Sequence, residues 1–162
     1  MNSTRGVSLL LVCVAFAGCG MQGTKPDAGG GTACHPITEP EVASLFERWN
    51  DSLQTGDAHK VVANYAPRSI LLPTVSNKPR VTEAEKLDYF EHFLANKPSG
   101  KIDLRFFAPG CNSAVDAGLY TFTFGTNGAV VHARYTYTYA WDGRQWLITS
   151  HHSSAMPEAA KP

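Results

Sequence analysis

The spacing of apolar positions changes its period once along the chain. Between Thr38 and Leu94, apolar residues recur every three or four positions, which predicts amphipathic helices. From Ile102 onward they recur at every second position, which predicts strands with one buried face. Helices that precede a run of antiparallel strands are typical of an α+β domain.

Three helices are predicted in the first half of the domain. The first begins at a capping box, in which Thr38 is followed by Glu41, and it ends at Gly56. Asp57 can cap a short second helix. A second capping box, which starts at Thr82, begins the third helix.

Five strands are predicted, a short one between the second and third helices and four after the third. The pair Asp142-Gly143 predicts a tight turn between the last two strands. A curved sheet wrapped against three helices makes a cone with a pocket at its open end. The predicted strands are residues 69–72, 102–108, 118–124, 130–141 and 146–152.

The first eighteen residues have the pattern of an export signal. Met1–Arg5 carries one positive charge, and the apolar run Val7–Ala17 is too short to span a bilayer. The small residues before Cys19 resemble a bacterial lipobox, where the signal is cut and the cysteine receives lipid. We therefore predict a lipoprotein signal peptide over residues 1–18. The alternative is an ordinary secretory signal, with Cys19 unmodified.

Residues 19–33 are rich in glycine and poor in apolar side chains, which predicts a flexible tether. The folded domain is expected over residues 34–158, and residues 159–162 form a short tail. Together with the lipobox, this organisation predicts an exported domain of the bacterial cell envelope, in or facing the periplasm. The lipid anchor would be its only attachment to the membrane.

The charge balance narrows the choice of partners. Lysine plus arginine and aspartate plus glutamate both number 14, so the formal net charge is zero. A neutral chain lacks the basic footprint that binds phosphate backbones, so no nucleic-acid partner is expected. The sequence carries no zinc signature, dinucleotide fingerprint or nucleophile elbow, so neither a metal nor a cofactor is expected.

Two cysteines, Cys34 and Cys111, remain once the signal peptide and Cys19 are set aside. In an oxidising compartment they can form a disulfide, which would tie the segment before the first helix to the sheet. The alternative is a pair of buried free thiols.

Several segments carry a family resemblance through their order along the domain: Leu45–Asn50, Leu72–Thr74, Asp88–Leu94, Ala133–Thr136 and Trp146–His152. Through them the chain resembles the association domain, or hub, of calcium/calmodulin-dependent protein kinase II. It is most similar to the stand-alone bacterial members, often labelled SgcJ/EcaC-type oxidoreductases with a SnoaL-like fold. The resemblance covers residues 37–158.

The resemblance implies a cone-shaped fold of the nuclear-transport-factor-2-like class, with three helices packed on a curved, mostly antiparallel sheet. It also implies self-association, as homodimers formed sheet to sheet and as larger rings. Kinase activity is not expected, because the chain has no glycine-rich phosphate loop and no His-Arg-Asp catalytic loop.

Arg134 lies in the middle of a predicted strand, where an unpaired buried charge would be costly. In the hub family an arginine on the matching strand points into the pocket and can hold a carboxylate. The resemblance therefore implies a ligand-binding role for Arg134, with Thr136 on the same face. The alternatives are an internal ion pair or an arginine that faces solvent.

His151 and His152 are neighbours on the last predicted strand, so their side chains point to opposite faces. They cannot grip one metal ion together. By resemblance, His152 is expected to look into the pocket as a proton acceptor or hydrogen-bond donor. A solvated or hydrogen-bonded strand end is favoured over catalysis for both histidines.

The aromatic residues have two interpretations. Tyr135, Tyr137 and Tyr139 share the face opposite Arg134, and the resemblance favours a subunit interface there. Packing against the helices is the alternative. On the helices, Trp49 and Tyr89 can line the cone and contact a ligand, although helical aromatic residues are more often part of a core.

Two functional hypotheses follow. The first is an oligomerisation and binding domain whose pocket holds a small anionic molecule. The second is a cofactor-independent enzyme, an isomerase, cyclase or oxidoreductase, with a pocket acid or histidine as general base. Nothing in the spacing of Asp88, Asp103 and Asp116 selects one of them as that base. A third interpretation is a domain with a vestigial pocket that serves only assembly.

Overall fold

The computed structural model describes Met1 and residues 33–157. Apart from Met1, the predicted signal peptide lies outside the described residues. So do Cys19, almost all of the predicted tether and the tail at 159–162.

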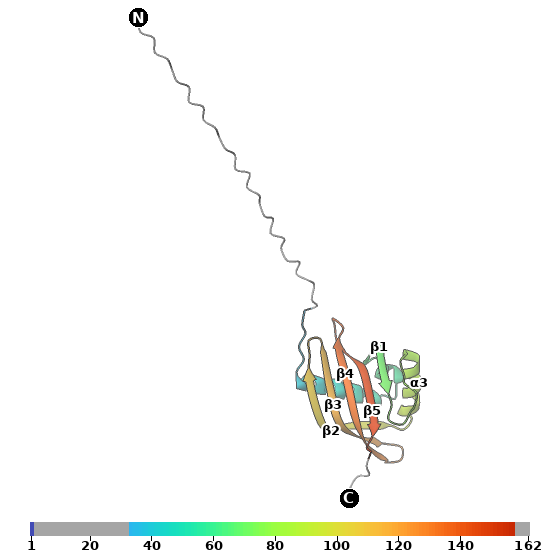
Figure 1. Cartoon of the computed structure of the whole chain (residues 1–162). Helices are drawn as coiled ribbons and strands as arrows, with labels where there is room; N and C mark the ends of the chain where they lie inside the picture. The colour runs from blue at the N-terminus through green and yellow to red at the C-terminus, as the bar shows by residue number, and fades with distance from the viewer. Residues whose placement is uncertain (2–32, 158–162) are drawn as a thin grey trace. The chain divides into compact units, whose positions relative to one another are not determined.

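The described residues form three helices and five strands in the predicted order (Figure 1). The helices are α1 (Glu39–Gln54), α2 (Ala58–Val62) and α3 (Glu83–Leu94). The strands are β1 (Tyr65–Leu72), β2 (Pro98–Pro109), β3 (Ser113–Phe124), β4 (Val130–Trp141) and β5 (Trp146–Ala155). Among these residues no helix is long and apolar enough to cross a membrane.

The strands make one sheet in the order β1-β5-β4-β3-β2. The edge strand β1 pairs parallel to β5, and the other three pairs are antiparallel. Figure 1 shows α1 crossing the strands on one face of the sheet. The predicted α+β class, with helices packed on a mostly antiparallel sheet, is confirmed.

Two of the helices begin at the predicted capping boxes. At the start of α3, the backbone N–H of Glu85 donates to Thr82 Oγ1 over 3.2 Å, and Glu85 Oε2 accepts from the N–H of Thr82 over 3.1 Å. At the start of α1, the backbone N–H and the hydroxyl group of Thr38 both donate to Glu41 Oε2, over 2.8 and 2.7 Å. These bonds satisfy backbone N–H groups that have no partner inside the helix.

The core lies between α1 and the inner face of the sheet. The side chains of Tyr135, Tyr137 and Tyr139 on β4 are at most 3% exposed and point toward the helices. Tyr137 meets Phe46 and Trp49 of α1, with ring centroids 6.2 and 5.8 Å apart. The expectation of a subunit interface on this face is therefore wrong, because burying three large rings inside outweighs exposing them.

The loop between β1 and α3 is fastened by a buried amine. Lys86, which is 1% exposed, donates from Nζ to the carbonyl oxygens of Ser69 and Val81 over 3.0 and 3.2 Å. The two carbonyls flank the loop, so one side chain on α3 holds both of its ends. Thr74 lies within this loop.

The segment before α1 is attached to the turn between β2 and β3. The backbone N–H of His35 donates to Asn112 Oδ1 over 2.7 Å, and Asn112 Nδ2 donates to the carbonyl of Ala33 over 3.2 Å. These bonds bring Cys34 beside Cys111, whose pKa rises because it hydrogen-bonds to the Cys34 thiol. Both cysteines are free and exposed, so the expectation of buried thiols is wrong.

The disulfide between Cys34 and Cys111 stays a prediction. Because folding brings the two thiols within hydrogen-bond reach, we expect oxidation to join them. Peptide mapping by mass spectrometry of unreduced protein should recover one cross-linked peptide containing both residues, and Cys111→Ser should abolish it. Recovery of both peptides as free thiols from protein purified without reductant would contradict the prediction.

Candidate functional site

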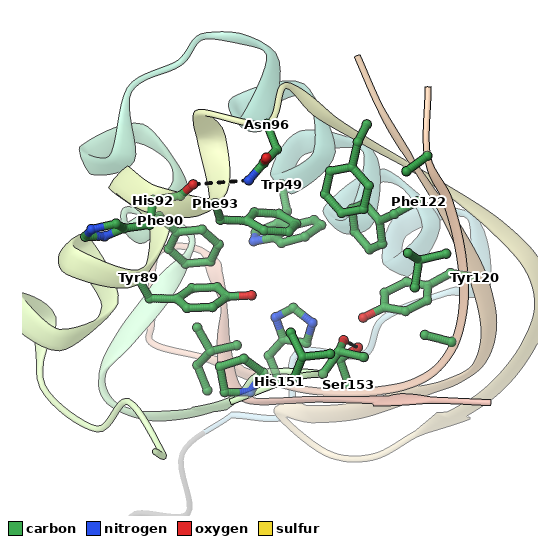
Figure 2. A pocket seen from close by; sticks show the side chains of 18 of the residues that line it. Trp49, Tyr89, Phe90, His92, Phe93, Asn96, Tyr120, Phe122, His151 and Ser153 are labelled. Carbon is green, nitrogen blue, oxygen red and sulfur yellow. Dashed lines mark hydrogen bonds between the residues drawn. The ribbon is translucent and has the colours of Figure 1, made fainter. Parts of the chain in front are cut away.

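An aromatic cavity of about 510 Å³ lies between α1, α3 and the inner face of the sheet. Its walls are mostly apolar, because α1 and α3 turn their aromatic stripes toward β3 (Figure 2). The aromatic residues of the wall are Trp49, Tyr89, Phe90, Phe93, Tyr120, Phe122 and Phe124. Trp49 and Tyr89 thus lie in the wall of the cavity, and their contact with a ligand stays a prediction.

One side of the cavity is polar, and we call it the polar wall: Thr74, Tyr120, His151 and Ser153. His151 and Ser153 are two apart on β5, so they share its inner face. The parallel pairing of β1 with β5 brings Thr74, two residues beyond β1, to a hydrogen bond with Ser153. Figure 2 shows that the hydroxyl group of Tyr120 points into the cavity, and that the hydroxyl group of Tyr89, which is outside the polar wall, does so as well.

His151 is the most constrained group of the polar wall. It is 4% exposed, its Nδ1 is 2.8 Å from the hydroxyl oxygen of Tyr65, and its ring stacks on Tyr137 with centroids 4.1 Å apart. Burial, assisted by the nearby His152, lowers the pKa of His151 to about 3. The imidazole is therefore neutral near pH 7.

The hydroxyl groups around His151 also stay protonated near neutral pH. Burial raises the pKa of Tyr89 to about 12, and it raises the pKa of Tyr120 further. No lysine, arginine, aspartate or glutamate lies among the described residues that line the cavity. The site thus offers neutral hydrogen-bond donors inside apolar walls.

Arg134 does not reach the cavity. Its guanidinium is exposed on the outer face of the sheet, where Nε donates to Ser154 Oγ over 3.1 Å and Nη2 to the carbonyl of Ala155 over 3.4 Å. Thr136 and His152 are paired on β4 and β5 and lie on that same face. The expectation that Arg134, Thr136 and His152 line the pocket is therefore wrong, and the alternative of a solvent-facing arginine holds.

A β-bulge explains why His151, rather than His152, faces inward. Thr138 pairs with Ser150 and Tyr139 pairs with Ile148, so Thr149 is an extra residue in β5. In a regular strand every second residue after the buried Ile148 would face inward, which would include His152. The extra residue shifts this alternation by one position, so His151 faces inward instead. No residue type around Thr149 marks the bulge in the sequence.

The candidate acids are all outside the cavity. Asp116 is fully buried, and its Oδ1 accepts from Arg105 Nε over 3.0 Å and from the Tyr135 hydroxyl over 2.8 Å. Burial raises the pKa of Asp116 against these two partners. Asp88 and Asp103 are exposed. Within residues 33–157, no group of three or more histidine, cysteine, aspartate or glutamate side chains could hold a metal ion.

A cone of helices on a curved sheet with an internal cavity defines the nuclear-transport-factor-2-like class. Within it, the family model "Calcium/calmodulin dependent protein kinase II association domain" matches residues 38–157. The chain belongs to this family. No curated protein matches it.

One similar solved structure supports the family, and two more distant ones share the fold. A Xanthomonas campestris protein described as an association domain of the same kind has 52% sequence identity and a TM-score of 0.70, over 74% of this chain and 88% of that one. The iota-carbonic anhydrase of a cyanobacterium, solved with bicarbonate, has 20% identity and a TM-score of 0.67, over 76% and 94%. A Pseudomonas putida protein of this fold class and of unknown function has 18% identity and a TM-score of 0.65, over 74% and 87%.

The neutral, buried His151 predicts a loss of stability in acid. Its pKa is about 3 in the folded chain against an ordinary value of 6.5, so below 6.5 the unfolded chain binds the extra proton. The free energy of unfolding should therefore fall as pH drops from 6.5 toward 3, by about 1.4 kcal/mol per pH unit from this residue.

Urea denaturation at about pH 7 and about pH 4.5 checks this expectation. The loss between the two conditions should be smaller in His151→Gln than in the wild type, by about 2–3 kcal/mol. His152→Gln, whose side chain is exposed, is the matched control and should behave as the wild type. Equal acid sensitivity in all three proteins would contradict the assignment.

Proposed function

We propose that the cavity binds bicarbonate and that the chain catalyses the reversible hydration of carbon dioxide. One observation carries the proposal. The hydrogen-bonding groups of the polar wall, Thr74, Tyr120, His151 and Ser153, face a mostly apolar aromatic space that no lysine, arginine, aspartate or glutamate among the described residues lines. A carbonic anhydrase that shares this fold was solved with bicarbonate.

The two halves of the cavity suit the two sides of the reaction. Carbon dioxide is apolar and favours the aromatic walls. A water oxygen held by the hydroxyl groups of Thr74 and Ser153 would attack its carbon, forming one C–O bond while one C=O electron pair moves to oxygen. The proton of the attacking water passes to solvent through the hydroxyl groups. The resulting oxyanion is stabilised by the preorganised donors of the polar wall.

No lysine or arginine among the described lining residues offers bicarbonate an ion pair. An anion that moves from water into an apolar site without a cationic partner loses hydration that neutral donors replace only in part. Bicarbonate would therefore bind weakly and leave quickly, which favours turnover over storage. This supports the enzyme hypothesis more than a tightly held anion.

A second candidate is the binding and assembly module, in which the chain holds a small anion without turning it over. The outer face of the sheet supports the assembly part of this candidate. On β2, Leu104 and Phe106 are 55% and 62% exposed, and they are available for contact with a second copy. Homodimerisation sheet to sheet, which the family resemblance implies, is proposed through this face.

The cellular setting is also part of the proposal. The signal-like residues 1–18 and Cys19 support export and lipid anchoring at the cell envelope. An exported carbonic anhydrase would act on carbon dioxide and bicarbonate outside the cytoplasm.

Stopped-flow measurement of carbon dioxide hydration with a pH indicator tests the activity. The protein should accelerate hydration above the buffer rate. Thr74→Val and Ser153→Ala should each lower kcat/KM by about 10- to 100-fold, because each removes a hydroxyl group that holds the attacking water in place. Thr136→Val, the same substitution on the outer face, should leave kcat/KM unchanged.

A wild-type rate equal to that of buffer would overturn the enzyme proposal. Carbon-13 NMR titration with labelled bicarbonate then separates the remaining candidates. Saturable binding that Thr74→Val weakens would favour the binding module, and no binding would favour a domain that serves only assembly.

A further inference from the structure

The imidazole of His151 has one ring nitrogen bonded and one without a partner. Nδ1 faces the Tyr65 hydroxyl at 2.8 Å, whereas the buried Nε2 has no hydrogen-bond partner among the described residues. His151 lines the aromatic cavity, and Figure 2 shows its ring at the edge of the open space. A buried polar atom without a partner calls for an explanation, and at the edge of a cavity a bound ligand atom can supply one.

We propose that Tyr65 fixes His151 in the tautomer that carries its proton on Nε2, so that the cavity presents an N–H donor to an oxygen atom of the ligand. Tyr65 is then a positioning residue that never touches the ligand. The proposal rests on the proposed function for the identity of the ligand, bicarbonate, but not for the tautomer itself.

The direction of the Tyr65–His151 hydrogen bond follows from the count of donors and acceptors. The Tyr65 hydroxyl is buried and protonated, because burial raises the pKa of Tyr65 well above its ordinary value. Its proton needs an acceptor, and the acceptor within hydrogen-bond distance is Nδ1. The nearby indole of Trp49 can only donate.

A neutral imidazole that accepts at Nδ1 must hold its single proton at Nε2. The opposite tautomer would leave the Tyr65 O–H without an acceptor in a buried position. It would also leave the lone pair of Nε2 unpaired, so it costs two buried polar groups at once. The Nε2–H tautomer leaves one donor free, and a ligand oxygen can satisfy it.

Packing fixes the direction in which Nε2–H points. The ring of His151 is stacked on Tyr137, with centroids 4.1 Å apart and planes at 29°. The ring of Trp49 meets another side of the imidazole edge-on, with centroids 5.3 Å apart and planes at 88°. Because the ring cannot turn without breaking these contacts, the donor is preorganised before the ligand arrives.

The donor selects the chemistry of the ligand at this point. An N–H group rejects ammonium and other pure donors and accepts a carbonyl, carboxylate or carbonate oxygen. The hydroxyl groups of Thr74 and Ser153 can both donate and accept, so they can serve the hydroxyl group of bicarbonate. The polar wall thus matches a small planar oxyanion that carries one O–H.

Nitrogen-15 NMR of the histidine side chains tests the tautomer in the full chain. His151 is assigned by the signals that disappear in His151→Gln. We expect Nε2 to show the shift and proton coupling of a protonated nitrogen and Nδ1 those of an unprotonated acceptor. Tyr65→Phe should mix or reverse the two patterns. A wild-type spectrum with the proton on Nδ1 overturns the inference, whether or not Tyr65→Phe folds.

Binding of carbon-13 bicarbonate tests the role of the donor. Tyr65→Phe and His151→Asn should weaken binding about tenfold, since neither keeps a donor fixed at the place of Nε2. His151→Gln, whose amide N–H₂ reaches that place, should keep more of the affinity than His151→Asn. Equal affinity in the wild type, Tyr65→Phe and His151→Asn overturns the inference.

The failure of the inference differs from the failure of the proposed function. An Nε2–H tautomer in a protein that neither binds bicarbonate nor hydrates carbon dioxide refutes the proposed function, and it upholds the assignment of Tyr65 as the positioning residue. Conversely, a protein that hydrates carbon dioxide but carries the His151 proton on Nδ1 supports the proposed function and refutes the assignment of Tyr65.

Discussion

The burial of three tyrosine rings on β4 determines which residues of the sheet face outward and which support the cavity. Tyr135, Tyr137 and Tyr139 are packed between the sheet and the helices. Since alternate residues of a strand face opposite ways, placing these rings inside sends Arg134 and Thr136 outside. The same rings then support the cavity, because Tyr137 stacks on His151 and meets Trp49.

Much of the fold was predictable because local chemistry and global packing agree. The capping boxes at Thr38 and Thr82 begin real helices, and the period-two pattern after Ile102 lies in real strands. Which face of β4 lies inside was not predictable from the family resemblance, which pointed to Arg134. The large apolar area of the three tyrosine rings was the better indicator of the inner face of β4, since a strand buries its bulkier apolar face.

The site was predicted only in part. Trp49 and Tyr89 were expected to line the cone because they lie on the apolar stripes of their helices, and both do so. The resemblance pointed to His152, whereas the bulge at Thr149 turns His151 inward, and Ser153 was missed because the predicted strand ended at His152. Thr74 was missed as a site residue because its neighbour in space is 79 positions away in sequence, which no local pattern reveals.

The contact between Thr74 and Ser153 also has a consequence for the order of folding. It depends on the parallel pairing of β1 with β5 and on the loop that Lys86 fastens from α3. Contacts between such distant parts of a chain carry a large loop-closure entropy and form late. The helices and hairpins can therefore assemble before the polar wall exists, and we expect the ability to hold a ligand to be among the last properties that the folding chain acquires.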